Sequence, residues 1–269
     1  MSAATSSVES SAEPLLLRED KDGVARLTLN RPRQFNALSA DLLTAVQQAF
    51  DEIAADASVR VVVLAGAGKA FCTGHDLKEM RARRDKAFVK ALFEQCSRMM
   101  MTIPRMPQPV IARVHGVATA AGCQLVAACD LALAAEEATF AVSGINVGLF
   151  CSTPAVALSR NVGRKAALEM LLTGEFIDAR TARERGLVNR VVPAADLDAE
   201  TGRLAATLVG KSALALSMGK RLFYGQIEAG LEAAYAQASE TIACNFMADD
   251  AAEGIDAFIE KRPPHWRGR

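Results

Sequence analysis

The hydrophobic positions near the start of the chain alternate with polar ones in two short stretches and then change to a helical spacing. Residues 15–18 and 24–29 alternate around Asp22-Gly23, a pattern that predicts a β-hairpin. After Ser39, whose side chain is typical of a helix cap, apolar residues recur every three or four positions. Residues 59–65 (VRVVVLA) are almost all β-branched or apolar, which is typical of a strand buried on both faces. This part of the chain therefore predicts strands that alternate with helices.

Helical spacing dominates from Pro154 to the end of the chain, with one short apolar stretch at 188–192 that predicts a strand. The whole pattern indicates a mixed α/β protein. Because no Gly- or Ser-rich linker separates the two halves, we expect a single domain, with a core at 14–195 and a helical C-terminal region at 196–269. The opening residues 1–13 are rich in Ser and Ala and predict a disordered tail.

The stretch GVATAAGCQLVAACD, from Gly116 to Asp130, combines a turn of small residues with the start of an apolar helix near Ala121. Backbone N–H groups in the first turn of a helix have no intrahelical partner and lie at the positive end of its dipole. The small side chains of this turn would let a ligand approach those groups closely. Two interpretations remain open from this pattern alone: tight packing of a strand against a helix, and a site for an anion or a developing oxyanion.

Composition and charge argue against several classes of function. Lys plus Arg and Asp plus Glu are balanced at 31 each, so no overall field favours nucleic acid as a partner. No apolar run approaches the roughly 18 residues that a membrane span requires. The six cysteines show neither CxxC pairing nor metal-ligand spacing, and the first residues lack the features of a secretory signal or a basic transit peptide. We therefore expect a soluble cytoplasmic protein that binds no metal, no nucleic acid and no membrane.

Several separated stretches add a more specific pattern. In chain order they are LNRPRQFNALS (29–39), VVVLAGAGKAFCTGHDLKEM (61–80), PVIARVHGVATAAGCQLVAACDLALAAEEATFA (109–141), LTGEFIDARTARERGLVNRVVP (172–193) and GIDAFIEKRPPHW (254–266). Together these stretches resemble the enoyl-CoA hydratase/isomerase (crotonase) superfamily. Within it, GVATAAGCQL and GINVGLFCSTPAVAL are most similar to the enoyl-CoA hydratase domain-containing protein 3 branch, and less similar to the housekeeping hydratases.

The resemblance implies a crotonase (ClpP-like) spiral of ββα units, closed by C-terminal helices that form homotrimers or hexamers. It also implies an acyl-CoA thioester as ligand, a hydratase-type lyase reaction of fatty acid metabolism, and no cofactor apart from the coenzyme A of the substrate. In the family, two backbone N–H groups bind the oxygen of an enolate. By motif, these groups correspond to the amides of His75 and Ala121, and one such donor contributes roughly 3–4 kcal/mol to transition-state stabilisation.

The rest of the expected chemistry departs from the family. Active hydratases carry two catalytic Glu residues, and the matching positions here are Gln124 and Gly144. An amide at Gln124 can position a water molecule but cannot transfer a proton near neutral pH. Loss of a positioned acid–base group lowers rates by roughly 10²–10⁴-fold, so hydration should be very slow. Polar or thiol groups in or beside the same loop are conceivable substitutes, namely Cys151, Ser152, Ser143 and Asn146, although each also has a plain structural interpretation.

The resemblance further suggests residues that contact the substrate or its coenzyme A, which are Arg33, His75, Asp76, Leu77, Lys78, Gly122, Gly144 and, from a neighbouring subunit, Lys261. Asp76 is also a natural cap for the helix that follows it. Two functions remain open, an enzyme acting on acyl-CoA thioesters and a catalytically weak acyl-CoA-binding or regulatory protein. A nicotinamide-dependent oxidoreductase would rest only on Gly66 and Gly68, which lack the spacing of a dinucleotide fingerprint.

Overall fold

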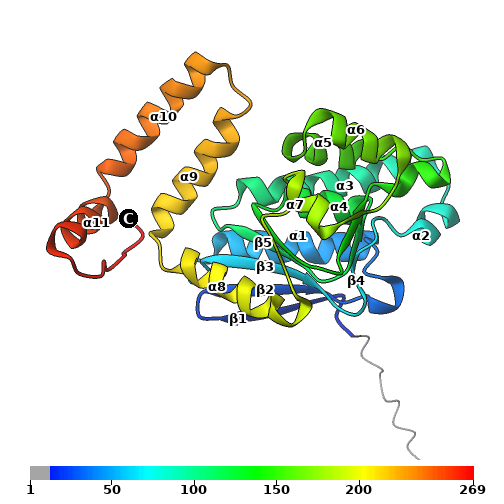
Figure 1. The fold of residues 1–269 in the computed structure, drawn as a ribbon, viewed down its shortest axis with the longest axis horizontal. Coiled ribbons are helices and arrows are strands. Elements are labelled where there is room, and N and C mark those ends of the chain that lie inside the picture. The colour runs from blue at the N-terminus through cyan, green and yellow to red at the C-terminus, as the bar shows by residue number, and fades with distance from the viewer. Residues whose placement is uncertain (1–12) are drawn as a thin grey trace, which may run out of the picture.

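The computed structural model describes residues 13–269, so the predicted tail at 1–13 lies outside the description except for Glu13. The larger of two sheets has the strand order β1-β2-β3-β5-β7-β10 (Figure 1). Its strands are β1 (Leu16–Lys21), β2 (Val24–Leu29), β3 (Val61–Gly66), β5 (Val110–Val114), β7 (Leu131–Ala135) and β10 (Arg190–Val192). The β1–β2 pair is the predicted antiparallel hairpin, and the other pairings are parallel.

A second sheet has the order β4-β6-β8-β9 and consists of β4 (Ala70–Cys72), β6 (Val117–Thr119), β8 (Thr139–Ala141) and β9 (Ile177–Asp178). Successive strands of the chain alternate between the sheets, since β3, β5 and β7 lie in the first and β4, β6 and β8 in the second. A helical segment follows each such pair of strands, which is the ββα spiral that the resemblance implied. The strands β4, β6 and β9 were not predicted, because two or three residues are too few to show a period.

Helices cover the sheets in the core of the protein. They are α1 (Ala40–Ala55), α2 (Leu77–Ala82), α3 (Lys86–Arg105), α4 (Ala121–Ala128), α5 (Ser152–Asn161), α6 (Arg164–Thr173) and α7 (Ala179–Glu184). As predicted, Ser39 caps α1, and its side chain accepts a hydrogen bond from the Leu42 N–H. The helix α3 continues through Pro104 and ends at Arg105. A proline this close to the end of a helix removes few backbone bonds.

The hydrophobic core lies between these layers. Its largest fully buried side chains include Phe50, Phe71 and Phe140. A smaller cluster on the larger sheet joins strand residues such as Val61 to Leu197 of α8 (Leu197–Val209). The helix α8 therefore packs on the sheet, although it belongs by sequence to the region predicted as C-terminal.

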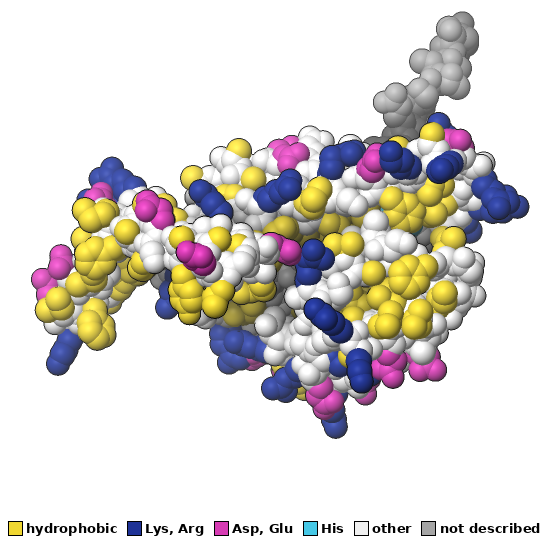
Figure 2. Space-filling view, turned by 90° about the horizontal axis from the view of Figure 1, so that it is seen from above, with side chains coloured by type: hydrophobic (Ala, Val, Ile, Leu, Met, Phe, Trp, Pro, Cys, Tyr) yellow, Lys and Arg dark blue, Asp and Glu magenta, His cyan; other side chains and the backbone are white. Residues whose placement is uncertain are grey.

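Three further helices extend away from the sheets, namely α9 (Ala213–Gln226), α10 (Leu231–Phe246) and α11 (Asp249–Glu260) (Figure 1). A buried ion pair attaches α9 to the core, with Lys220 Nζ 2.7 Å from the Asp130 carboxylate. Tyr224 of α9 donates a second hydrogen bond to Asp130 at 2.8 Å. Figure 2 shows hydrophobic side chains gathered on this projecting region, where Met247 and Phe258 are 82% and 85% exposed. Such exposure is typical of a surface that another protein chain covers.

None of the helices described between residues 13 and 269 is both long enough and apolar enough to cross a membrane.

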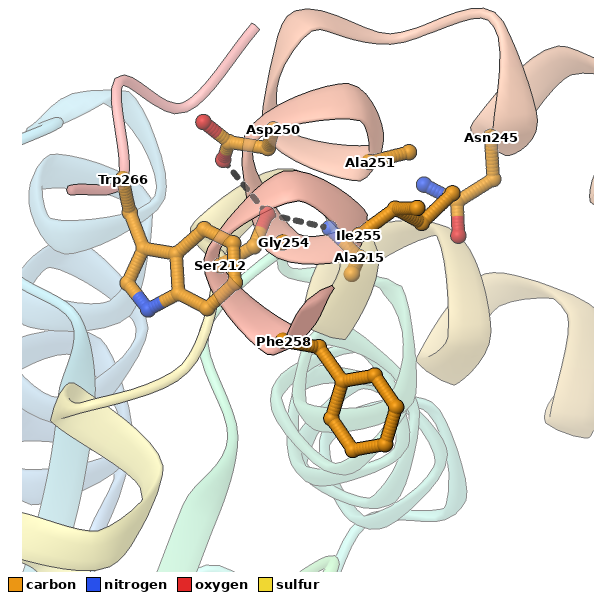
Figure 3. A pocket seen from close by; sticks show the side chains of 9 residues that line it. All are labelled: Ser212, Ala215, Asn245, Asp250, Ala251, Gly254, Ile255, Phe258 and Trp266. Carbon is orange, nitrogen blue, oxygen red and sulfur yellow. Dashed lines mark hydrogen bonds between the residues drawn. The ribbon is translucent and has the colours of Figure 1, made fainter. Parts of the chain in front are cut away.

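Residues 266–269 fold back onto α11 and form what we call the C-terminal clasp, made by Asp250, Ser212, Trp266 and Arg267. Figure 3 shows the first three of these residues. The buried Asp250 carboxylate accepts hydrogen bonds from Ser212 Oγ and from the Arg267 N–H, both at 2.6 Å. The Trp266 indole N–H donates to the Gly210 carbonyl at 2.8 Å. The clasp borders a pocket of about 440 Å³, which lies among α9, α10 and α11 and not at the predicted site.

Candidate functional site

Two turns that are far apart in the sequence meet beside the second sheet. Gly74 follows β4 with a φ of +90°, and a Cβ at this position would stand 2.8 Å from Ala120 Cβ and 3.1 Å from the Ala121 amide nitrogen. No side chain therefore fits between the turns without displacing one of them. The absence of a side chain at Gly74 lets the backbone just before His75 lie directly against the start of α4.

The direction of the His75 amide follows from its pairing with Leu38. The Leu38 N–H donates to the Gly74 carbonyl at 2.7 Å, and the Asp76 N–H donates to the Leu38 carbonyl at 3.2 Å. These two bonds form a parallel bridge between Leu38 and His75. In such a bridge one residue bonds to both neighbours of the other, so the N–H of His75 itself points away from Leu38. The loop at 36–38 thus leaves this amide available on its opposite side.

The second amide belongs to Ala121, the first residue of α4. The first bond of the helix runs from the Gln124 N–H to the Ala120 carbonyl at 3.0 Å, so the Ala121 amide lies at the positive end of the helix with no intrahelical partner. Ala120 has φ +51° and ψ −120°, a conformation that is strained for a residue with a side chain by roughly 1–3 kcal/mol. Strain of this kind is concentrated at functional sites, and here it directs the chain into α4.

Three residues in this region carry buried side-chain nitrogen or oxygen atoms that make no hydrogen bond within the described part of the chain, namely His75, Gln124 and Thr153. Gln124 is 4% exposed and lies in the first turns of α4. Thr153 lies at the start of α5, which packs against α4. Buried polar atoms without partners are rare in proteins, and a bound ligand is one of the few explanations. Such atoms also occur elsewhere in the described chain, so here they support a binding site together with the contact of the two turns.

The imidazole of His75 is neutral at this site. Its ring packs on Phe93 of α3, with the ring centroids 4.4 Å apart. Burial lowers the pKa of His75 to about 4, and the nearby Leu38 backbone offsets only part of this effect. At pH 7 the ring therefore offers one donor and one acceptor but no charge.

The loop that follows β8 leaves no room for a side chain at Gly144, the position of the second catalytic Glu in active hydratases. The Gly144 N–H donates to Cys151 Sγ at 3.3 Å. A Cβ at position 144 would stand 2.6 Å from the Leu149 carbonyl oxygen and 2.8 Å from Cys151 Sγ. The geometry therefore excludes a side chain at Gly144 unless the loop moves.

The polar side chains that could substitute for that carboxylate already make hydrogen bonds to other groups of the protein. Ser143 Oγ and Thr119 Oγ1 share a hydrogen bond at 2.8 Å, and Asn146 donates to the Gly174 carbonyl at 3.2 Å. Ser152 Oγ donates to the Phe150 carbonyl at 3.3 Å. Burial raises the pKa of the Cys151 thiol, and a protonated thiol is a poor nucleophile.

Both interpretations of the stretch from Gly116 to Asp130, tight packing and an oxyanion site, apply, but to different residues. A Cβ at Gly122 would stand 2.0 Å from the Cys72 carbonyl oxygen, so this glycine is required by packing between α4 and β4. Cys72 and Cys123 are fully buried and are part of the core. The contact of Gly74 with Ala121, in contrast, places the backbone next to His75 directly against the start of α4.

The residues predicted to contact coenzyme A differ in exposure. Arg33 is exposed in a short 3-10 helix (Pro32–Gln34), and Leu77 and Lys78 are exposed at the start of α2. Asp76 caps α2 as predicted, by accepting from the N–H groups of Lys78 and Glu79. Lys261 ends α11 in the projecting region, so the structure of one chain does not bring it to the two turns (Figure 1).

Sequence reasoning missed two residues of this region. Thr153 resembles an ordinary helix-start residue in the sequence, and only its unpartnered hydroxyl distinguishes it. Arg31 forms an ion pair with Asp76, with Nη2 3.0 Å from Oδ2. A signal for Arg31 was present, because it lies within the LNRPRQFNALS stretch, but its partner could not be identified from spacing. Among residues 13–269 no group of three or more His, Cys, Asp or Glu side chains could hold a metal ion.

Comparisons with known proteins agree with this geometry. The sequence pattern of the enoyl-CoA hydratase/isomerase family matches residues 19–269. The chain is 44% identical over 258 residues to the mouse mitochondrial enoyl-CoA hydratase domain-containing protein 3, covering 96% of this chain and 86% of the mouse protein. The crystal structure of a Mycobacterium smegmatis enoyl-CoA hydratase is similar with a TM-score of 0.93 and 60% identity, covering 94% of this chain and 99% of that one. The human enoyl-CoA hydratase domain-containing protein 3 has a TM-score of 0.92 and 43% identity, with coverages of 94% and 100%.

The expectation of a cytoplasmic location is wrong by these comparisons, because the similar proteins from mouse, frog and human carry mitochondrial in their names. Unpaired cysteines indicate that a protein occupies a reducing and not an oxidising compartment, but they do not indicate which reducing compartment it occupies. The similarity in sequence and fold, together with the paired turns at Gly74 and Ala121, shows that the chain belongs to the enoyl-CoA hydratase/isomerase family.

Proposed function

We propose that this protein binds acyl-CoA thioesters and polarises the thioester carbonyl between the amides of His75 and Ala121. The observation that carries the proposal is the contact of the two turns, in which a Cβ at Gly74 would stand only 3.1 Å from the Ala121 nitrogen. Two N–H donors that converge on one carbonyl oxygen stabilise an enolate or a tetrahedral oxyanion. The neutral His75 ring and the strained Ala120 support the assignment of this region as the site.

In this proposal the reaction is an enolate-type or thioester reaction of the hydratase/isomerase class, with slow hydration of enoyl-CoA. Gln124 positions a water molecule or a polar group of the ligand through its buried, unpartnered Oε1. It cannot replace a carboxylate in proton transfer. The carboxylates nearest in sequence to the two amides are Asp76 and Asp130, and both are held in ion pairs, with Arg31 and Lys220.

The second candidate function is an acyl-CoA-binding or regulatory protein with little turnover. The closed position at Gly144 favours it, because a catalytic carboxylate has no room there. In both functions coenzyme A enters as part of the ligand, contacting Arg33 and the 75–78 segment, and Lys261 contributes from a neighbouring subunit. The exposed apolar side chains of α10 and α11 support self-association as a homotrimer or a hexamer.

The test combines binding and turnover on the full chain. We expect butyryl-CoA at 100 times its Kd to stabilise the protein by about 2.7 kcal/mol and to raise Tm clearly above the value with free CoA. Crotonyl-CoA, followed by its enoyl-thioester absorbance, should disappear slowly. The absence of any Tm increase with acyl-CoA would contradict the proposal. Rapid hydration that Gln124→Ala abolishes would instead contradict the reasoning on the missing carboxylates.

A further inference from the structure

The segment that carries the His75 amide is held from one side by the loop at 31–38. Besides the two bonds of Leu38, the Thr73 N–H donates to the Phe35 carbonyl at 3.2 Å. The loop therefore contacts the segment both before and after Gly74. Since the 73–76 segment lies between a sheet and a short helix, the position of this loop sets the position of the amide.

Arg31 joins the loop to the same segment through its side chain. Its Nη2 donates to Asp76 Oδ2 at 3.0 Å, and its Nη1 donates to the carbonyl of Ala37. The side chains of Arg31 and Asp76 are only 16% and 15% exposed. One planar guanidinium thus fixes two points, the carboxylate directly after His75 and the carbonyl directly before Leu38.

Asn36 anchors the loop in turn. It is fully buried, and its side-chain oxygen accepts the Arg31 N–H at 2.9 Å. Its amide nitrogen donates to the carbonyls of Ala67 and Ala70, both at 2.8 Å. Ala67 follows β3 and Ala70 begins β4, so the backbone of Arg31 is tied to both sheets.

Asp76 is held ionised by these contacts. Burial disfavours its charge, but the hydrogen bonds from Arg31 and from the Glu79 N–H, with the charge of Arg31, outweigh burial and lower the pKa of Asp76. The ionised carboxylate caps α2 through one oxygen and binds Arg31 through the other. The start of α2 and the turn at His75 are therefore oriented by the same group.

We infer that Arg31 is a positioning residue, which aims the N–H of His75 at the thioester oxygen by holding Asp76 and Ala37 in fixed places. The inference rests on the proposed function, because it assumes an acyl-CoA thioester in the site. Arg31 does not touch the reacting atoms, so it acts only through the backbone. A residue that merely stabilised the fold would change Tm without changing the hydrogen bonds to the bound carbonyl.

The test uses butyryl-CoA labelled with ¹³C at the thioester carbonyl, bound to the full chain and observed by difference infrared spectroscopy. In the wild type we expect the carbonyl stretch of the bound ligand to lie below its solution value. Arg31→Met should remove at least half of this shift and weaken butyryl-CoA binding about 3- to 10-fold, while binding of free CoA changes less than twofold. Arg31→Lys should restore part of the shift, because one ammonium can reach Asp76 but cannot reproduce the forked contact.

The matched control is Arg185→Met, which removes another arginine ion pair, with Glu169 at 2.8 Å; it should keep the wild-type shift. If Arg31→Met does not fold, Asp76→Asn decides, since Asn also caps helices but lacks the charge that holds Arg31. A wild-type shift that persists in the folded Arg31 variant, or in Asp76→Asn, would overturn the inference alone. A bound wild-type ligand with an unshifted carbonyl would overturn the proposed function.

Discussion

A methyl group at Gly74 should separate the two amides of the proposed oxyanion hole. The added Cβ of Gly74→Ala would stand 2.8 Å from Ala120 Cβ and 3.1 Å from the Ala121 nitrogen, and the residue keeps a φ of +90°. Both neighbours belong to the backbone turn or to a side chain with no freedom to move away. The turn at 73–76 or the start of α4 must therefore shift.

The magnitude follows from two contributions. A side chain in a left-handed conformation costs about 1–2 kcal/mol, and one extra carbon in a tightly packed place costs about 1–3 kcal/mol. Together they lower Tm by roughly 4–20 °C for a protein of this size. In the site, loss of one hydrogen bond to the carbonyl weakens binding by about 0.5–1.5 kcal/mol, which is about a 2- to 12-fold increase in the Kd for butyryl-CoA.

The assay compares butyryl-CoA with free CoA by titration calorimetry, at a temperature where the variant is folded. Gly148→Ala is the matched control, because Gly148 has a φ of +78° but no atom within 4 Å of the position that an added methyl group would take; it carries the backbone strain without the contact. We expect only Gly74→Ala to lose affinity for the acylated ligand. Wild-type affinity for butyryl-CoA in folded Gly74→Ala would refute the idea that the two amides share one oxygen.

Two further predictions concern proton chemistry. Gln124→Glu should raise the hydration rate of crotonyl-CoA by at least about 10-fold, because it restores one acid–base group. Gly144→Glu should lower Tm and add no activity, because the loop leaves no room for a side chain at this position. Strong activity in Gly144→Glu alone would show that the loop opens easily. His75 has a folded-state pKa of about 4 against a reference value of 6.5, so the unfolded chain binds a proton first and stability decreases as the pH falls from 6.5 to 4, by up to about 3 kcal/mol. Thermal unfolding between pH 7 and pH 4.5 should show a flatter decrease for His75→Gln than for the wild type, and parallel curves would contradict the neutral buried ring.

Much of the fold follows from local sequence patterns. The hairpin around Asp22-Gly23, the cap at Ser39 and the buried strand predicted at 59–65 each have a strong signal within a few residues. The structure contains all three, with the strand at Val61–Gly66. Most of the second sheet has no such signal, because β4, β6 and β9 are two or three residues long and pair only with distant segments. Its existence follows from the resemblance to the family and not from periodicity.

The site shows the same division. The stretches around His75 and Ala121 identify the two turns, but the contact between them depends on Gly74, whose role is visible only in three dimensions. The absence of carboxylates at positions 124 and 144 can be seen in the sequence. The sequence does not show that position 144 has no room for a side chain, because the obstacle is the backbone carbonyl of Leu149.

The C-terminal clasp makes Arg269 part of the architecture. The Asp250 N–H donates to the Arg269 carbonyl at 3.0 Å, and the Arg269 side chain lies 3.0 Å from the Asp249 carboxylate. Replacement of Arg269 would weaken these contacts at the start of α11, next to the exposed apolar face of that helix, so a change at this residue should also affect any chain that packs on that face.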